Sequence, residues 1–166
     1  MFYQLVRVFQ KAFGHPAPDK VTALTLDRTV ARGGWTVEEV VEMIQQSSKS
    51  EAEFDTAMTQ LREKLEAAVV KSKLDSYNQT EKDFVIGQLD ALVDQLVFVN
   101  GSLVEMGIDP EPFFKIVMDA NMAKLGADGK PIIRESDGKI MKPEGWEPPE
   151  PKMLAELEKL LNSQKK

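Results

Sequence analysis

Between Thr36 and Ile108 the chain has no proline, and its apolar residues recur at every third or fourth position instead of every second. This spacing places apolar side chains along one face of an α-helix, whereas a half-exposed strand requires strict alternation. Because proline breaks the interior of a helix, so long a stretch without it favours long, continuous helices. The central part of the chain is therefore predicted to be α-helical.

Six helices are predicted from this spacing and from residues that start or stop helices. Thr80 and Asp109 are expected to cap helix N-termini. In the second helix Gly33 and Gly34 predict a kink or a break, with Thr36 as a new N-cap and Glu39 three residues beyond it. The predicted ranges are Phe2–Phe13, Leu26–Gln46, Glu51–Leu74, Glu81–Met106, Pro110–Lys124 and Pro151–Leu161.

The segment 126–151 differs from the rest because it is rich in glycine and proline. Asp137-Gly138 between two apolar runs is a hairpin signal, which predicts a short two-stranded β-ribbon followed by an extended arm. Trp146 in this arm is interpreted as a core or subunit contact, and the lysines of the ribbon, such as Lys130 and Lys142, as solvated charges. The expected fold is an all-α helical bundle with a core at 1–125, the ribbon and arm at 126–151, and a final short helix with a frayed tail at 152–166.

Composition excludes several classes of protein and site. At 166 residues the chain is long enough for one domain, and with no cysteine and a single histidine it has no disulfide, thiolate or multi-histidine metal site. Its 21 basic and 27 acidic residues give a net charge of −6, which argues against nucleic-acid or membrane-surface partners. No apolar run reaches the roughly 18 residues of a membrane span, and no signal-peptide pattern is present, so a cytoplasmic protein is expected.

The predicted helix Glu81–Met106 contains two aspartates in an otherwise apolar setting. It is apolar nearly all round, which is typical of a helix buried on most sides. Asp90 and Asp94 lie one turn apart on one face. Buried carboxylates are costly unless hydrogen-bond donors or a cation compensate them. A structural ion pair with a basic residue of another helix and a metal site both remain open.

A second group of acids lies in the segment WTVEEVVEMI, residues 35–44. Glu38, Glu39 and Glu42 fall on one sector of a helix, and none has a basic residue four positions later. A solvated glutamate face is the usual interpretation of such a pattern. Glu38 and Glu42 repel each other at this spacing, however, and a divalent cation would remove that penalty. Oxygen ligands favour Mg²⁺, with Mn²⁺ as the alternative.

An E-E-x-x-E helix followed by a later helix with an acid pair resembles the all-α nucleoside triphosphate pyrophosphohydrolases. This superfamily includes MazG, dimeric dUTPases and phosphoribosyl-ATP pyrophosphohydrolases. Four further segments resemble its phosphoribosyl-ATP-pyrophosphohydrolase-like branch. They are F-x-x-A-F-G-x-P (9–16), DALVDQLVFVNGSLVEMGID (90–109), DANMAKLGADGKPI (119–132) and GK-x-x-KP-x-GW-x-PP (138–149).

The resemblance implies a set of metal ligands. In the family an E-x-x-E pair and an E-x-x-D pair hold Mg²⁺. Glu39 and Glu42 match the first pair, and Asp94 matches the last acid of the second. The family's remaining glutamate is replaced here by Ala91, and Asp90, one residue earlier, is expected to substitute for it.

The resemblance also implies the reaction, which is hydrolysis of the α–β phosphate bond of a nucleotide to a nucleoside monophosphate and pyrophosphate. Glu38 or Glu39 would orient the attacking water as a base. Asn121 and Lys124 would bind the substrate, with Lys124 on a phosphate. The alternative for Lys124 is an ordinary surface lysine at a helix C-terminus. The basic residues of the ribbon could also close over the phosphates, although solvated charge is the preferred interpretation of Lys130, Arg134, Lys139 and Lys142.

Three functions therefore remain in view. The first is a general nucleoside triphosphate pyrophosphohydrolase. The second is a specialised one acting on dUTP, dCTP or phosphoribosyl-ATP. The third, kept open by Ala91, is a non-catalytic helical interaction protein on the same fold. The long amphipathic helices and the resemblance both predict a homodimer or a dimer of dimers.

Overall fold

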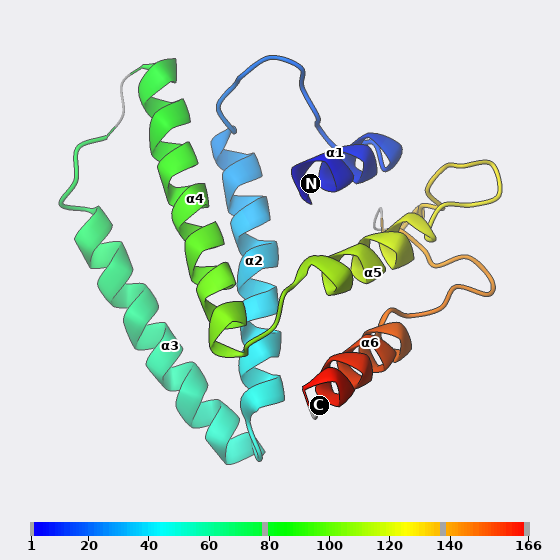
Figure 1. The fold of residues 1–166 in the computed structure, drawn as a ribbon. Coiled ribbons are helices and arrows are strands. Elements are labelled where there is room, and N and C mark those ends of the chain that lie inside the picture. Colours follow the sequence, from blue (N-terminus) through cyan, green and yellow to red (C-terminus); the bar gives the residue numbers. More distant parts are fainter. Residues whose placement is uncertain (1, 78–79, 137–138, 165–166) are drawn as a thin grey trace. The chain divides into compact units, whose positions relative to one another are not determined.

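The computed structural model of the protein describes residues 2–77, 80–136 and 139–164. The regular secondary structure of these residues is entirely helical, so the all-α prediction is confirmed (Figure 1). The helices are α1 (Phe2–Ala12), α2 (Leu26–Ser47), α3 (Glu51–Ser72), α4 (Glu81–Glu105), α5 (Glu111–Met122) and α6 (Glu150–Ser163). The predicted start of α4 is also confirmed, because the Asp83 N–H donates to the Thr80 hydroxyl at 3.2 Å.

The chain divides into two compact units. One contains Met1–Lys20 and Gln95–Lys166, and the other contains Val21–Asp94. The first includes α1, α5 and α6, the second includes α2 and α3, and α4 contributes residues to both.

Helix α2 runs unbroken through Gly33 and Gly34, so the predicted kink was wrong. It begins after Thr25, whose side-chain oxygen accepts a hydrogen bond from the Arg28 N–H at 3.3 Å. Thr36 is not an N-cap, since its hydroxyl donates to the carbonyl of Arg32 within the helix, at 3.1 Å. Each glycine destabilises a helix by about 1 kcal/mol, and a helix of 22 residues can tolerate two of them.

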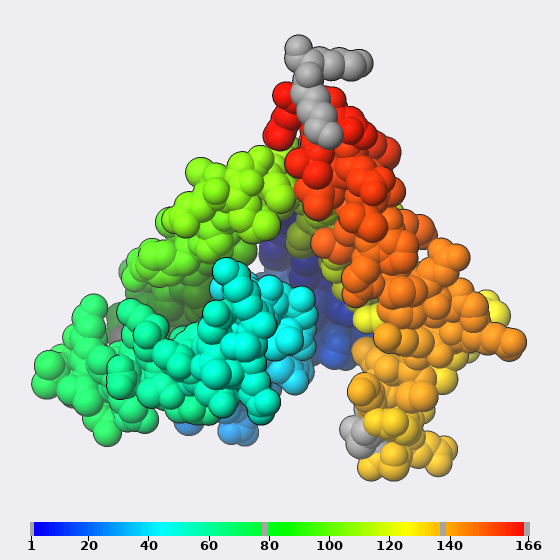
Figure 2. Space-filling view, turned by 90° about the horizontal axis from the view of Figure 1, so that it is seen from below, coloured from blue at the N-terminus to red at the C-terminus, as the bar shows by residue number. Residues whose placement is uncertain are grey.

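In the unit Val21–Asp94, α3 contacts α2, and Figure 1 shows the two helices meeting at the end where the loop joins them. Figure 2 shows this end in cyan and green-cyan. The extended segment before α2 is held to α4 by Gln88. The side-chain oxygen of Gln88 accepts from the Leu24 N–H at 2.8 Å, and its nitrogen donates to the Leu24 carbonyl at 3.0 Å. One amide side chain thus satisfies both backbone groups of Leu24.

Gln88→Leu is expected to lower the free energy of unfolding by about 1–3 kcal/mol, because it leaves two part-buried backbone groups without their partner. Urea unfolding followed by circular dichroism measures the change. Gln60→Leu on α3 is the control, because Gln60 is exposed and its side chain makes no hydrogen bond within the described ranges. An equal loss in both variants would contradict the role given to Gln88.

In the other unit, α5 packs against both α1 and α6. Phe2 of α1 stacks on Phe114 of α5 with ring centroids 4.2 Å apart. Phe13 and Met118 are the buried apolar residues of the described chain, at 6% and 7% exposure. The core that the structure shows within one chain is therefore small and lies between α1 and α5.

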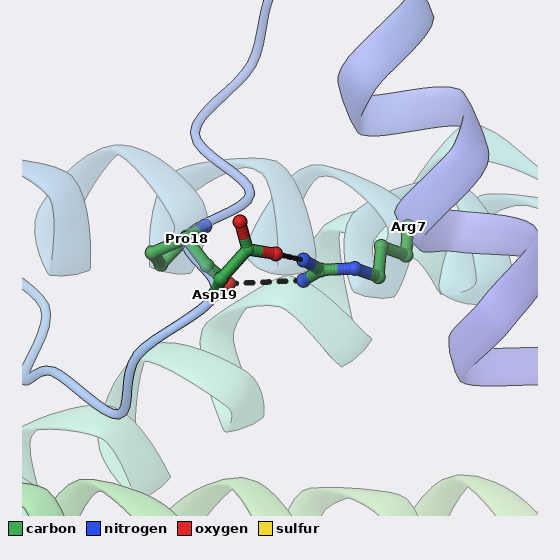
Figure 3. Close-up of polar contacts among 3 residues, drawn as sticks. All are labelled: Arg7, Pro18 and Asp19. Carbon is green, nitrogen blue, oxygen red and sulfur yellow. Dashed lines mark hydrogen bonds and ion pairs between the residues drawn. The ribbon is translucent and has the colours of Figure 1, made fainter.

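The proline-containing connector after α1 is held back against that helix by Arg7. The guanidinium donates to the carbonyl of Pro18 at 3.0 Å and forms an ion pair with Asp19 (Figure 3). Since proline and its neighbours already favour an extended backbone, two side-chain contacts are enough to place this segment.

The predicted β-ribbon is not supported. The described residues between α5 and α6 contain no strand, and their pairing is limited to isolated antiparallel bridges of Leu125 with Pro131 and of Ile133 with Ile140. Among the described residues, two backbone hydrogen bonds join 132–134 to 139–141, from the Arg134 N–H to the Lys139 carbonyl at 2.9 Å and from the Met141 N–H to the Ile132 carbonyl at 2.7 Å, and they do not extend into a ladder. The predicted turn residues Asp137 and Gly138 lie outside the described residues. An extended arm is what remains of the prediction.

Burial of α4 was predicted, and in this structure it is wrong, because no residue of α4 is buried. The apolar side chains of α4 that are exposed are Phe84, Ile86, Leu89, Leu92, Val93, Leu96, Val97, Phe98, Val99 and Val104. By length and composition alone α4 could also cross a membrane, contrary to the expectation that no such segment exists. A helix that packs inside a soluble assembly passes the same test.

Candidate functional site

Helix α2 carries three of the predicted site acids on its exposed side. Glu38, Glu39 and Glu42 are exposed, whereas Val41 and Ile44 are half-buried. Helix α2 contacts α3, although its apolar residues Val37 and Met43 stay exposed, and this contact leaves the glutamates available to a ligand.

Asp90 and Asp94 lie one turn apart on α4, in the same unit as α2, and both are exposed. The structure does not bring the five acids into one group. Among the described residues, no set of three or more acidic or histidine side chains lies close enough together to hold a metal ion.

The same five acids form no ion pair with a lysine or arginine within the described part of the chain. The alternative of structural acid–base pairs therefore gains no support. The carboxylate oxygens remain free for another cation, and a donor set made only of carboxylates suits Mg²⁺.

A basic and aromatic stripe on α2 was missed by the sequence analysis. The guanidinium groups of Arg28 and Arg32 lie 5.3 and 5.8 Å from the ring centroid of Trp35. Intervals of four or three residues separate Arg28, Arg32, Trp35, Glu39 and Glu42. These five residues therefore lie on one face of the helix. That spacing was the signal available in the sequence.

The predicted pair Asn121 and Lys124 is brought together at the C-terminal end of α5. The Lys124 Nζ donates to Asn121 Oδ1 at 2.8 Å, and both side chains are half-buried. Burial lowers the pKa of the Lys124 ammonium from its ordinary value, and the nearby charge of Lys142 lowers it further. Lys124 is therefore more than a solvated surface lysine.

Two residues of the arm, Lys142 and Trp146, lie at the same place, and the sequence analysis assigned neither of them to a site. The indole N–H of Trp146 donates to the carbonyl of Ala120 at 2.8 Å, which holds the arm on α5. The Nζ atoms of Lys142 and Lys124 lie 4.1 and 5.7 Å from the Trp146 ring centroid. The available signal was the run KPEGW, which brings a lysine and a tryptophan together across a turn.

Comparisons with known proteins agree with the resemblance found in the sequence. A family model described as phosphoribosyl-ATP pyrophosphohydrolase matches residues 6–121. A crystal structure of a "putative NTP pyrophosphohydrolase" from Exiguobacterium sp. 255-15 is similar over 98% of this chain and 97% of that chain, with 50% identity and a TM-score of 0.95. Among curated proteins, none matches. The five acids and Asn121 lie inside the family match, whereas Lys124, Lys142 and Trp146 follow it.

Proposed function

The chain belongs to the phosphoribosyl-ATP pyrophosphohydrolase family and is a nucleotide pyrophosphohydrolase, and we propose that it hydrolyses the α–β phosphate bond of nucleoside triphosphates. The products would be a nucleoside monophosphate and pyrophosphate. The observation that carries this proposal is that the predicted carboxylates all fall within the matched residues 6–121 and have no basic partner among the described residues.

Glu39, Glu42, Asp90 and Asp94 are proposed to hold Mg²⁺ or Mn²⁺. When bound, such a cation neutralises phosphate oxygens and lowers the pKa of a water molecule. Glu38 or Glu39 orients the attacking water and accepts its proton as the new P–O bond forms. The bond from the attacked phosphorus to the α–β bridging oxygen breaks in the same step, and the bridging oxygen leaves with the departing group.

Asn121 and Lys124 are proposed to bind the nucleotide. Lys124 keeps two ammonium hydrogens beyond the one that it donates to Asn121, which is enough for contacts to phosphate oxygens. The amide of Asn121 both orients Lys124 and offers its own N–H groups to the sugar, base or phosphate.

A homodimer, or a dimer of dimers, is proposed to cover α4. A contiguous apolar surface of this kind is rare on a monomer and typical of an interface. A second copy of the chain brings the same apolar helix, so a two-fold symmetric contact would cover both copies at once. If the protein requires detergent to stay in solution, the membrane alternative for α4 is favoured instead.

The proposed reaction is tested with a panel of nucleoside triphosphates, including dUTP and dCTP, and with phosphoribosyl-ATP. Each is incubated with and without Mg²⁺, and pyrophosphate and phosphate are assayed separately. We expect Mg²⁺-dependent release of pyrophosphate, with no more orthophosphate than a blank produces. Preference for one base would identify a specialised enzyme. Absence of pyrophosphate from every substrate would overturn the proposal.

A further inference from the structure

The arm between α5 and α6 contains a turn that sets the position of a lysine. The backbone N–H of Trp146 donates to the Pro143 carbonyl at 3.1 Å, and Gly145 has φ +77°. A positive φ at the third residue of a four-residue turn is the mark of type II, which favours glycine there. Lys142 directly precedes this turn, and its Nζ lies 4.1 Å from the Trp146 ring centroid.

The turn is anchored to the helix that carries Lys124. The indole N–H of Trp146 donates to the Ala120 carbonyl, one turn before Lys124. Because Lys124 and Lys142 both lie over this ring, their ammonium groups are no more than about 10 Å apart, the sum of the two distances. A di- or triphosphate is long enough to contact both.

Two like charges are thus held at one place. Neither lysine forms an ion pair with a carboxylate in the described ranges, and the nearby Glu147 pairs with Lys152 at 3.5 Å instead. Burial, and then the nearby charge of Lys142, lower the pKa of the Lys124 ammonium. A bound anion would remove this repulsion, whereas a neutral ligand would not.

We propose that Lys124 and Lys142, held against Trp146, form an anion site that binds the phosphate groups of the nucleotide and of the pyrophosphate product. Lysine suits this ligand because its ammonium is a compact point charge that contacts phosphate oxygens from many directions. The identity of the ligand as a nucleotide or pyrophosphate rests on the proposed function. The existence of an anion site rests on the contacts of Lys124, Lys142 and Trp146. Lys142, first interpreted as a solvated charge, is thereby assigned to binding.

The test is calorimetric titration of the full chain with inorganic pyrophosphate, without divalent cations and without turnover. We expect saturable binding that weakens at least tenfold in Lys142→Gln and in Lys124→Gln. Lys142→Arg, which keeps the charge, should stay within about threefold of the unmodified protein. The matched control is Lys130→Gln, an exposed lysine of the same arm, which should bind pyrophosphate like the unmodified protein.

A second readout uses the ring itself. The chain has two tryptophans, so Trp35→Phe leaves Trp146 as the only indole. Pyrophosphate should change the fluorescence of this variant, and the change should vanish when Lys142→Gln is added. A lysine that only stabilises the arm would lower the melting temperature in Lys142→Gln and leave pyrophosphate affinity unchanged.

The two proposals fail in different ways. If pyrophosphate does not bind, or if Lys142→Gln binds it like Lys130→Gln, the anion site is wrong whatever the enzyme hydrolyses. If pyrophosphate binds as expected and no nucleotide is hydrolysed, the anion site stands and the proposed reaction is wrong. In an active enzyme, Lys142→Gln should raise KM for the nucleotide at least tenfold, with a smaller effect on kcat.

Discussion

Glu39→Gln is expected to lower kcat by at least about 100-fold, because it replaces a charged ligand and a candidate base by a neutral amide of the same shape. The loss should appear with every nucleotide that the enzyme accepts, and raising the Mg²⁺ concentration should not restore the rate fully. Steady-state release of pyrophosphate measures it. Glu39 is exposed, so the variant should unfold like the unmodified protein.

The control for this substitution is Glu66→Gln, which removes an exposed glutamate from α3 instead of α2. Equal activity in both variants would show that the acids of α2 have no part in the reaction. Asp90→Asn tests the expected replacement of the family's glutamate. Its loss of activity should be reversed by adding Ala91→Glu, since that change restores the E-x-x-D spacing to Asp94. Failure of the rescue would exclude a simple exchange of ligands.

Phe98→Asp is expected to raise the dissociation constant of the proposed homodimer by at least about 100-fold, because it removes an aromatic anchor and places an unpaired carboxylate in an apolar contact. Phe98 is 71% exposed in the single chain, so the substitution disturbs little within one copy. Sedimentation velocity over a range of protein concentrations measures the change. The monomer formed should also unfold at a lower temperature than the dimer.

The comparison variant is Leu65→Asp on α3, where an apolar side chain is 56% exposed but lies between the charged residues Lys64 and Glu66. It should leave the dimer intact. If Phe98→Asp sediments like the unmodified protein at every concentration, α4 is not the interface. Phe98→Ala, a milder change, keeps the test decisive if the aspartate variant aggregates.

The helices could be predicted because their signals are local. Thr80 supplies the predicted N-cap of α4, and apolar spacing of three and four residues located every helix to within a few positions. Predictions failed where a local glycine or turn signal competes with the hydrogen bonding of the whole segment. Gly33 and Gly34 weaken α2 but do not break it, and Asp137-Gly138 suggested a hairpin in a segment whose described pairing stops at isolated bridges.

The candidate site was predictable only in part. Asn121 and Lys124 are one turn apart in sequence, and the structure joins them by a hydrogen bond. The acids of α2 and α4 are not joined among the described residues, and their shared role stays a prediction from the family pattern. Lys142 was interpreted as a solvated charge because its place beside Lys124 depends on Trp146 being anchored to Ala120, a contact across 26 residues that no periodicity reveals.

The half-buried position of Lys124 has a consequence for proton balance. Its pKa is lowered in the free protein, first by burial and then by Lys142, and a bound phosphate would raise it again. Between the Lys124 pKa of the free protein and the higher pKa of the phosphate complex, binding therefore takes up a proton, and product release gives that proton back. Affinity for the anion falls as the pH rises through this range. Because Trp146 holds Lys124 and Lys142 together, phosphate binding at the arm depends on protonation of the Lys124 amine.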